Sequence, residues 1–367
     1  MSNLPLNRVA ILTSHLSTGD AVSNDAVGMC QAFRKRGIDA RLFAGGWDEV
    51  EHEMFPVAEV GNFLLSKDDL LIYHFSIEWK PALELLSALK CRRAIKYHNV
   101  TPPEFFKGIS LWHEEKCREG LEQLKLIARM NCDIYLADSE FNRQDLLRAG
   151  ASAERCFVVA PFHHTDRLLA IEGAIHILDG YRDGRTIILM VGRIAPNKGH
   201  AQLIEAFANY YHSYNRNSRL VIVGKEEAAF ASYSKRLHEL TKTLLSREAV
   251  SFTGEATDNE LKAFYLLSSV FAIASEHEGF CVPLVEAMAM KVPVVAYASS
   301  AIPATVGDAG PVLDERNPFL MAETINRLTS DEELNVAVGM MGWQRYERYF
   351  ANEKIEAEMF RALSHLE

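Results

Sequence analysis

Short apolar runs alternate along the chain with longer segments in which apolar residues recur at helical spacing. In the first half, the runs predict buried strands at 8–14, 69–75, 93–99, 132–138 and 156–161. The segments 24–37, 114–130 and 139–150 between them have helical spacing, and the last begins with Ser139 and ends with Gly150, which are typical cap residues. The first half therefore predicts alternating strands and helices.

A second series of the same kind starts near residue 186. Its strands are predicted at 186–192, 219–224, 250–254, 270–275 and 292–297, with helical segments between them. Strand–helix alternation that occurs twice predicts two doubly wound parallel sheets, with the break between them at 161–185. The final segment, 342–366, is predicted to be helical and has no strand after it.

Composition narrows the class of protein. The 367 residues are 48% hydrophobic and 24% charged, which suits two soluble domains. No basic-plus-apolar start resembles a signal peptide, and no apolar run approaches the roughly 20 residues that span a bilayer, so we expect a cytoplasmic protein. The net charge of −10 argues against a nucleic-acid partner. The six cysteines lack zinc-type spacing, so we expect reduced thiols and no metal site.

The first candidate site follows the predicted strand at 186–192. Ligands of open parallel sheets bind beyond the carboxyl ends of the strands. Here Gly192 and Arg193 are followed by Lys198 and Gly199, directly before a helical segment. Two cations on a glycine-bounded turn at a helix start suit a diphosphate, because backbone amides, helix dipole and side chains all favour negative charge. An ordinary surface turn explains the spacing equally well.

The second candidate site is SEHEGFCVPLVEAMA at 275–289, after another predicted strand. Gly279 permits a tight turn close to a ligand, and Pro283 suits the start of a helix. Glu278 then lies on the loop and Glu286 about one turn into the helix, so both can face one ligand. Backbone amides before this helix can meet an anion; they belong to Phe280, Cys281 and Val282. Two glutamates that cap and solubilise a helix are the alternative, and the commoner one.

Three further positions are weaker candidates. Gly254 lies in FTGEATD at 252–258, where the backbone can read a nucleotide base, or where Asp258 simply caps the next helix. His15 and His74 lie near predicted strand ends of the first half, where contacts with a substrate and roles in packing are equally compatible with the sequence.

The combination of VGRIAPNKGHAQLIEAF with SEHEGFCVPLVEAMAMKVPVVAY resembles the retaining, nucleotide-sugar-dependent glycosyltransferases of GT-B architecture, family 4 type. The signature of that family is a pair of glutamates separated by seven residues, here Glu278 and Glu286. Softer similarities in the first half are STGDAVSND, KYHNVTPPEFF and ADSEFNRQDLL, so the resemblance covers the whole chain.

The resemblance implies a role for each candidate residue. Arg193 and Lys198 would hold the donor diphosphate, Glu286 the ribose and Glu278 the hydroxyl groups of the donor sugar. The amides of Phe280 and Cys281 would lie beside the sugar and the phosphate. His98, after a strand of the first domain, would reach the donor sugar. Gly19 would belong to a loop that closes over the phosphate and the acceptor.

Two positions depart from the family pattern. The family often has glycine where Cys281 stands, which matters little if the backbone amide is the functional group. It usually has a glutamate in the position of Ala304, in AIPATVGDAG, so the supporting contact that this glutamate would make is not expected here.

The implied reaction needs cations and backbone amides that stabilise the departing diphosphate. No Asp-x-Asp motif for a metal is present, so we expect a metal-independent reaction without a cofactor. Retention of configuration is compatible with a double displacement or with same-face attack, in which the leaving phosphate takes the acceptor proton. We favour same-face attack, because the resembled family has no agreed nucleophile.

The expected architecture is α/β, GT-B, with two Rossmann-like doubly wound parallel-sheet domains facing across a cleft. Residues 1–165 would form the acceptor-side domain, completed by a C-terminal helix at 350–367, and residues 166–349 the donor-side domain. Ile355, Met359, Phe360 and Leu363 recur on one face of that helix, as packing against the first domain requires.

The expected function is transfer of a hexosyl unit from a UDP- or GDP-sugar to a hydroxyl group of a glycan or lipid-linked saccharide, in cell-surface polysaccharide synthesis. A location at the inner face of the membrane, with peripheral contact through the N-terminal domain, is compatible with such an acceptor. Two alternatives stay open. A sugar-nucleotide epimerase of similar fold would need no acceptor, and a non-catalytic sugar-nucleotide-binding subunit would be expected to have lost the charged residues that are present here.

Overall fold

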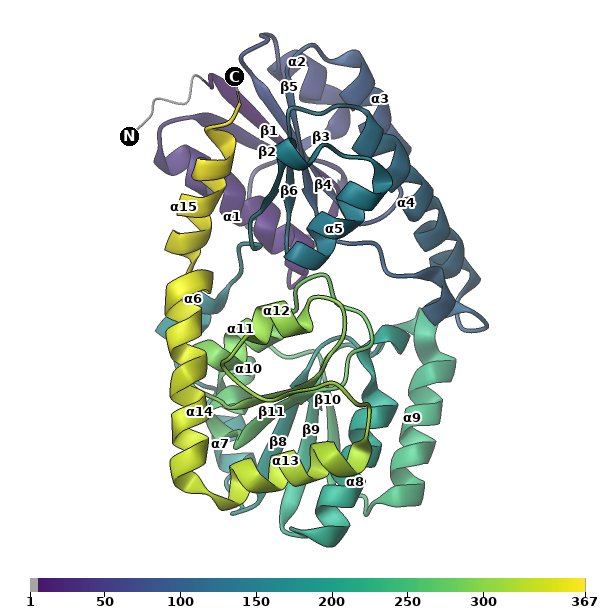
Figure 1. Cartoon of the computed structure of the whole chain (residues 1–367), viewed down its shortest axis with the longest axis vertical. Helices are drawn as coiled ribbons and strands as arrows, with labels where there is room; N and C mark the ends of the chain where they lie inside the picture. The colour runs from purple at the N-terminus through teal and green to yellow at the C-terminus, as the bar shows by residue number, and fades with distance from the viewer. Residues whose placement is uncertain (1–5, 367) are drawn as a thin grey trace. The chain divides into compact units, whose positions relative to one another are not determined.

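The computed structural model describes residues 6–366, which form two compact units (Figure 1). The first unit contains the described residues up to Pro103, then Trp112–His164 and the chain from Asn352 onward. The second contains Glu104–Leu111 and Thr165–Ala351. Each unit has its own parallel sheet and its own hydrophobic core.

The sheet of the first unit is parallel throughout, with the strand order β3-β2-β1-β4-β5-β6-β7. Its strands are β1 (Arg8–Leu16), β2 (Asp39–Trp47), β3 (Met54–Pro56), β4 (Leu70–Phe75), β5 (Arg92–Tyr97), β6 (Ile134–Ala137) and β7 (Cys156–Val158). The order reverses direction between β1 and β4. In doubly wound sheets, such a switch point is where the carboxyl ends of the strands offer a binding crevice.

Helices of the first unit form where the sequence supplies caps and one apolar face. The longer ones are α1 (Ala21–Lys35), α3 (Lys80–Ala88), α4 (Leu111–Arg129) and α5 (Glu140–Ala149), and α2 (Val60–Phe63) is a single turn. The Asp20 side chain accepts from the backbone amide of Ser23 at the start of α1. At α5, Ser139 caps the start and Gly150 ends the helix with a left-handed backbone, as the sequence predicts.

The last helix, α15 (Asn352–Leu363), packs on the first unit rather than on the residues that precede it in the chain. Figure 1 shows it beside α1, where the rings of Phe33 and Phe360 lie 5.3 Å apart between centroids. Its buried face joins the same hydrophobic core as β1 and α1. That face consists of Ile355, Met359, Phe360, Ala362 and Leu363.

The sheet of the second unit is also parallel, with the order β10-β9-β8-β11-β12-β13. Its strands are β8 (Thr186–Val191), β9 (Ser218–Val223), β10 (Val250–Gly254), β11 (Val270–Ile273), β12 (Val294–Tyr297) and β13 (Val312–Leu313). The switch point lies between β8 and β11. Both strands are nearly fully buried, as expected for a parallel sheet that is covered on both faces.

The helices of the second unit cover this sheet on both faces (Figure 1). They are α6 (Thr165–Ala170), α7 (Ile175–Tyr181), α8 (His200–Ser213), α9 (Ala231–Leu244), α10 (Asp258–Leu267), α11 (Val282–Ala289), α12 (Ile302–Val306), α13 (Pro318–Ser330) and α14 (Glu332–Arg345).

The fold confirms the predicted pair of parallel α/β sheets, with differences in detail. The strands β2, β3 and β13 are absent from the apolar runs of the sequence, because β2 carries Asp39, Arg41 and two adjacent glycines and the other two are very short. The helical C-terminal segment is interrupted, since a π-helical turn at Tyr346–Phe350 ends at Ala351 before α15 begins. The segment Glu104–Leu111 groups with the second unit although it lies within the predicted N-terminal domain.

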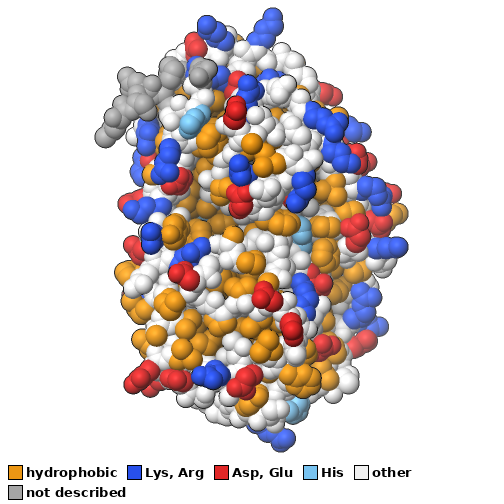
Figure 2. Space-filling model, in the orientation of Figure 1, with side chains coloured by type: hydrophobic (Ala, Val, Ile, Leu, Met, Phe, Trp, Pro, Cys, Tyr) orange, Lys and Arg blue, Asp and Glu red, His pale blue; other side chains and the backbone are white. Residues whose placement is uncertain are grey.

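Lys, Arg, Asp and Glu side chains are interspersed over the face drawn in Figure 2. Among residues 6–366, no helix combines the length and the apolar character needed to cross a bilayer. A peripheral membrane contact through the first unit stays a prediction.

Candidate functional site

Two sequence motifs follow the two strands that flank the switch point of the second unit. Residues 192–199 come after β8, and residues 275–282 come after β11, which is hydrogen-bonded to β8. The two loops contact each other directly. The backbone amide of Glu276 donates to the carbonyl of Asn197 at 2.8 Å, and the Asn197 side chain donates to the carbonyl of His277 at 3.1 Å. The sheet topology therefore brings both predicted motifs to one place.

Glycines make this close approach possible. Gly199 has φ +66°, and a Cβ added there would lie 1.9 Å from the carbonyl oxygen of Ala274. Gly224, at the end of β9, faces Gly192 in the same way, since an added Cβ would lie 2.0 Å from the Gly192 carbonyl oxygen. Gly192 itself has φ +152°. Residues with side chains cannot occupy Gly199 or Gly224 without moving the backbone. Sequence reasoning missed Gly224.

Lys198 and Glu278 form the central ion pair of the site. The Lys198 Nζ lies 2.8 Å from Oε1 and 2.9 Å from Oε2 of Glu278. The Glu278 side chain is 7% exposed and that of Lys198 is 20% exposed, so the pair is buried on the glutamate side and reaches solvent on the lysine side. The amide of Glu278 donates to the Ser300 hydroxyl at 2.7 Å, which holds the loop. A cation and a carboxylate are thus positioned together at the end of β8 and β11.

Arg193 belongs to the same turn but has a different partner. Its Nη1 lies 2.8 Å from Oε1 of Glu227, and the arginine side chain is 64% exposed. Sequence reasoning did not anticipate Glu227, which lies before α9. The structure therefore places one predicted cation in the buried pair and the other on the surface of the turn.

Glu286 lies in α11 and is buried against Tyr265 of α10. The Tyr265 hydroxyl donates to Oε2 of Glu286 at 2.7 Å. Burial raises the pKa of the Glu286 carboxyl to about 7, although the tyrosine hydrogen bond opposes this rise. The carboxyl is thus poised to change charge near neutral pH. Sequence reasoning missed Tyr265, because it lies within an ordinary helical pattern that gives no sign of a polar contact.

The loop between the two glutamates has an unusual backbone. Cys281 adopts the left-handed conformation, with φ +81° and ψ +74°, and no side chain among the described residues caps the start of α11. Phe280 is buried, its carbonyl accepts from the Thr305 hydroxyl at 2.7 Å, and its ring meets that of Phe350. Val282 is the first helical residue, and Gly279 lies in the preceding bend. The left-handed turn gives a physical reason for the glycine that the family often has at position 281.

The loop after β10 contains Gly254, which has φ +75° and whose carbonyl accepts from the amide of Gly224. Gly254 is thereby linked to the glycine that contacts Gly192. The following helix, α10, is capped by Thr257 in a capping box with Glu260. The predicted cap Asp258 is therefore wrong by one residue; Asp258 is the first helical position instead.

Gly19 and His98 belong to the first unit. Gly19 has φ +78° and lies in the exposed turn between β1 and α1, at the carboxyl end of β1. His98 follows β5, and its side chain is 4% exposed. Its Nδ1 lies 2.9 Å from Oδ2 of Asp138, and its Nε2 lies 2.9 Å from Nδ1 of His74. Both of its ring nitrogens therefore have partners inside the first unit.

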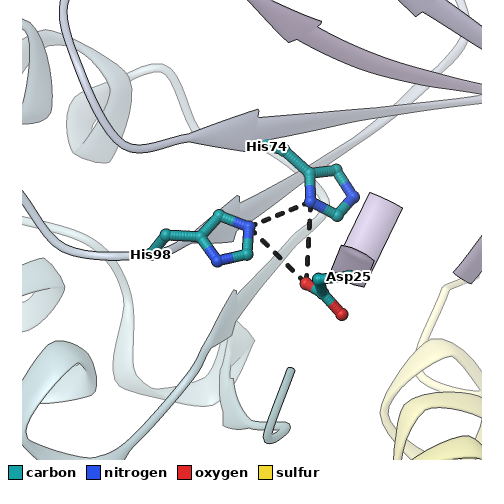
Figure 3. A group of neighbouring side chains, drawn as sticks. All are labelled: Asp25, His74 and His98. Atoms are coloured by element: carbon teal, nitrogen blue, oxygen red, sulfur yellow. Dashed lines mark hydrogen bonds and ion pairs between the residues drawn. The ribbon is translucent and has the colours of Figure 1, made fainter. Parts of the chain in front are cut away.

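Figure 3 shows His98 with His74 and Asp25, whose facing atoms lie within 4.8 Å of one another. Asp25 Oδ2 is 3.5 Å from His98 and 3.6 Å from His74. Three such atoms are potential metal ligands, but Lys96 Nζ lies 3.7 Å from the same Asp25 oxygen and contacts Asp138 at 2.6 Å. The lysine ammonium already supplies a positive charge to the two carboxylates.

The electrostatics of this group follow from burial. Burial raises the pKa of Asp25, against the lowering effect of Lys96 and His98. Burial would also raise the pKa of Asp138, but His98 and Lys96 together hold it below its ordinary value. The pKa of His74 is well below its ordinary value because of burial and of the neighbouring His98 and Lys96. His74 is thus neutral, and the Lys96 ammonium faces both carboxylates of the group.

Comparison with known proteins finds similarity to glycosyltransferases. The family model of the glycosyl transferases group 1 matches residues 179–342. A D-inositol 3-phosphate glycosyltransferase of Corynebacterium jeikeium is 28% identical over 219 residues, which is 57% of this chain and 52% of that protein. A GDP-mannose-dependent alpha-(1-6)-phosphatidylinositol monomannoside mannosyltransferase of Mycobacterium tuberculosis is 28% identical over 221 residues, 57% of this chain and 56% of that protein. The chain thus spans about half the length of these relatives.

Similarity of the fold extends over the whole chain. The solved structure of Anabaena HepE, in complex with UDP and glucose, superposes with a TM-score of 0.78 at 18% identity, covering 97% of this chain and 99% of that one. A second structure of HepE contains UDP-glucose. The chain has the GT-B fold, and the stretch 179–342, a little under half of its length, matches the family model of the glycosyl transferases group 1.

Proposed function

We propose that the protein transfers a hexosyl unit from a UDP- or GDP-sugar to a hydroxyl group of a glycan or lipid-linked saccharide, with retention of configuration and without a metal. The observation that carries the proposal is the meeting of Lys198 with Glu278 at the switch point between β8 and β11. A sugar nucleotide needs a cation for its diphosphate and a hydroxyl acceptor for its sugar within a short distance. This pair supplies both.

Each residue of the site then has a defined task. The donor diphosphate replaces Glu278 as the partner of Lys198. Arg193 turns from Glu227 to the same phosphates, because its side chain is exposed and its ion pair is with one glutamate. Glu278 is left to accept from the sugar hydroxyl groups. Glu286 accepts from the ribose, and the backbone of Gly192, Gly254 and the 279–282 loop lines the remainder of the donor.

The proposed chemistry is stabilisation of the leaving group. Cleavage of the bond between the anomeric carbon and the phosphate oxygen places negative charge on the diphosphate, where Lys198 and Arg193 stabilise it more than they stabilise the ground state. The acceptor hydroxyl attacks the same face of the sugar, and its proton passes to the departing phosphate oxygen. Neither glutamate has to act as a nucleophile.

His98 is proposed as a contact of the donor sugar, as the resemblance implies. Its side chain would have to exchange its contact with His74 for one with the sugar, since Asp138 holds the opposite ring nitrogen. Gly19 is proposed to give the turn after β1 the freedom to cover the substrate, because its left-handed backbone favours glycine.

The first experiment identifies the donor and tests the clamp. The protein is incubated with UDP-, GDP- and ADP-sugars, and the thermal shift selects the donor, since a bound ligand stabilises the native state. Lys198→Ala and Arg193→Ala should each lower turnover by about 100-fold or more, the scale for loss of one charge-stabilising donor. Lys225→Ala, an exposed lysine of the same unit, is the control and should leave turnover unchanged. Full turnover in both clamp variants would refute the assignment.

A second measurement separates the two glutamates. Glu286→Ala should weaken binding of the free nucleoside diphosphate as well as the sugar nucleotide, because both contain ribose. Glu278→Ala should weaken the sugar nucleotide selectively. If both variants lost affinity for the nucleoside diphosphate and for the sugar nucleotide equally, the assignment of Glu286 to the ribose and of Glu278 to the sugar would be wrong. Turnover of the sugar nucleotide to an isomer without any acceptor would instead favour the epimerase.

A further inference from the structure

An exposed tryptophan stands at the carboxyl edge of the sheet in the first unit. Trp47 is the last residue of β2, in register with Leu16, the last residue of β1. Its side chain is 41% exposed, whereas the other side chains at this end of β2, from Leu42 to Ala44, are buried. An indole at the carboxyl end of a parallel strand lies where ligands of such sheets bind.

A hollow of about 420 Å³ opens beside this tryptophan. It is lined by Trp47, Asp48, Glu49, Val50, His52 and Met54. Its volume is within the usual range for small-molecule sites. An aromatic face with nearby carboxylates and an imidazole is a suitable surface for a sugar ring, which has apolar C–H faces and hydroxyl groups around its edge.

The hollow is tied to the turn that contains Gly19. The amide of Asp48 donates to the carbonyl of Leu16 at 3.0 Å, and the Thr18 hydroxyl donates to the carbonyl of Glu49 at 3.3 Å. His15 contributes a further contact, with Nε2 3.4 Å from Asp48 Oδ1. A ligand in the hollow is thus next to the turn after β1.

Charge around the hollow is of one sign. Between Trp47 and Met54 the chain carries four acidic residues and no lysine or arginine. All four are exposed; they are Asp48, Glu49, Glu51 and Glu53. Among residues 6–366, Asp48 is the one member of this acidic group with an ion-pair partner, the imidazole of His15. A phosphate placed against Trp47 would meet this acidic loop without a compensating cation from it, whereas hydroxyl and ammonium groups would find acceptors.

We propose that the hollow beside Trp47 binds the acceptor, and that the ring which stacks on the indole is an uncharged or amine-bearing sugar rather than a phosphorylated one. The inference rests on the proposed transfer function and adds the class of acceptor. It separates this protein from the relatives named for inositol 3-phosphate, whose acceptor carries a phosphate at the sugar-like ring. The carboxylates of the loop accept from the hydroxyl or ammonium groups of the acceptor ring.

Binding at Trp47 can be observed without any transfer. The protein is labelled with 5-fluorotryptophan, and the four fluorine resonances are assigned by single Trp→Phe variants. Methyl glucoside, methyl mannoside, methyl galactoside and glucosamine are titrated, with glucose 6-phosphate as the anionic probe. The Trp47 resonance should shift with at least one neutral or amino sugar and not with glucose 6-phosphate, while that of Trp112, the exposed control, stays fixed. A shift with glucose 6-phosphate of equal size, or with no probe at all, overturns the proposal.

Kinetics then separate this inference from the proposed function. Trp47→Ala should raise the KM for the acceptor about tenfold, the effect of losing one buried ring face, and leave the KM for the donor unchanged. Trp112→Ala should change neither. Glu49→Lys with Glu51→Lys should improve binding of glucose 6-phosphate. An unaltered acceptor KM in Trp47→Ala refutes the subsite, whereas failure of the donor thermal shift with every sugar nucleotide refutes the proposed function instead.

Discussion

Charged side chains gather at the carboxyl edges of both sheets, but they are held in different ways. In the first unit, Lys96 and Asp25 are fully buried and Asp138 is 5% exposed, and these groups compensate one another within the unit. In the second unit, Lys198 keeps 20% of its side chain in solvent and Arg193 keeps 64%. The first arrangement is closed on itself, whereas the second presents cations that a ligand can reach.

The difference teaches which charges serve stability and which are available for binding. A buried charge that loses its partner leaves an uncompensated ion in a region of low dielectric, which is costly. An exposed charge that exchanges one partner for another loses little, because water screens the intermediate state. Substitution of the buried lysine should therefore mainly lower stability, and substitution of the partly exposed lysine should mainly lower turnover.

The largest expected effect is that of Lys96→Met. Removal of the ammonium leaves Asp25 and Asp138 buried without the lysine cation that faces both of them, so the free energy of unfolding should fall by about 3 to 5 kcal/mol. Lys198→Met should cost less, about 1 to 2 kcal/mol, because a single carboxylate, that of Glu278, loses its partner and the lysine side of the pair reaches solvent, while turnover is lost. Hydrogen exchange in β1 and β5, compared with β8 and β11, assigns each loss to its unit.

Lys225→Met is the matched control, since it removes an exposed lysine from a surface pair. Similar losses of stability in Lys96→Met and Lys198→Met would show that burial does not distinguish the two edges. An intact free energy of unfolding in Lys96→Met would mean that the buried group rearranges without its cation.

The sequence predicts the two sheets well because apolar runs mark buried parallel strands directly. It fails at β2, where Asp39, Arg41 and the glycines at 45 and 46 conceal a strand that lies beside β1. The segment Glu104–Leu111 could not be assigned either. Its partners are set by tertiary contacts, such as the stacking of Phe106 on Phe230, which no local pattern encodes.

The sequence predicts which residues form the candidate site, but it does not predict which cation contacts which glutamate. Motif positions identify Lys198, Glu278 and Glu286, but the sequence does not say that Lys198 contacts Glu278 while Arg193 contacts Glu227. Lys198 and Glu278 are 80 residues apart in the chain, so their contact depends on the order of the strands in the sheet. Tyr265 was missed for the same reason, because its hydroxyl becomes relevant only when α10 packs beside α11.

A smaller effect concerns the pH dependence of stability. The folded pKa of Glu286 is raised from 4.5 to about 7 by burial, so the folded state binds its proton more tightly than the unfolded state. The protonated Glu286 carboxyl therefore adds to the free energy of unfolding, and this stabilisation is fully present below about pH 4.5. It is lost as the pH rises through 7, and the loss is at most about 3 kcal/mol. Urea unfolding of the wild type and of Glu286→Gln from pH 5 to 8 measures this loss as their difference.

Glu239→Gln, on the exposed side of α9, serves as the control and should show no such divergence from the wild type. The same titration has a consequence for binding. Donor affinity should rise between pH 6 and 8 more in the wild type than in Glu286→Gln, because an ionised carboxylate is the better acceptor for ribose hydroxyl groups. Parallel stability curves for wild type and Glu286→Gln would contradict the raised pKa.

The smallest effect compares two left-handed residues, one at each edge. Asn99, after His98, has φ +82°, and Cys281 has φ +81°. Asparagine tolerates this conformation, and the Asn99 side chain donates to Asn142 at 3.0 Å and to Asp145 at 3.1 Å.

Cys281→Gly should be more stable than Cys281→Ala by about 1 kcal/mol, a rise of about 2 to 4 °C in Tm, because glycine adopts the left-handed conformation without steric cost. Asn99→Gly should instead fall below wild type, because relief of the backbone comes with loss of both hydrogen bonds. Ala287→Gly, within α11, controls for the ordinary cost of glycine and should lower Tm. If Cys281→Gly is no more stable than Cys281→Ala, the turn before α11 carries no backbone strain, and the glycine that the family often has at this position needs another reason, such as close approach of the donor to the backbone.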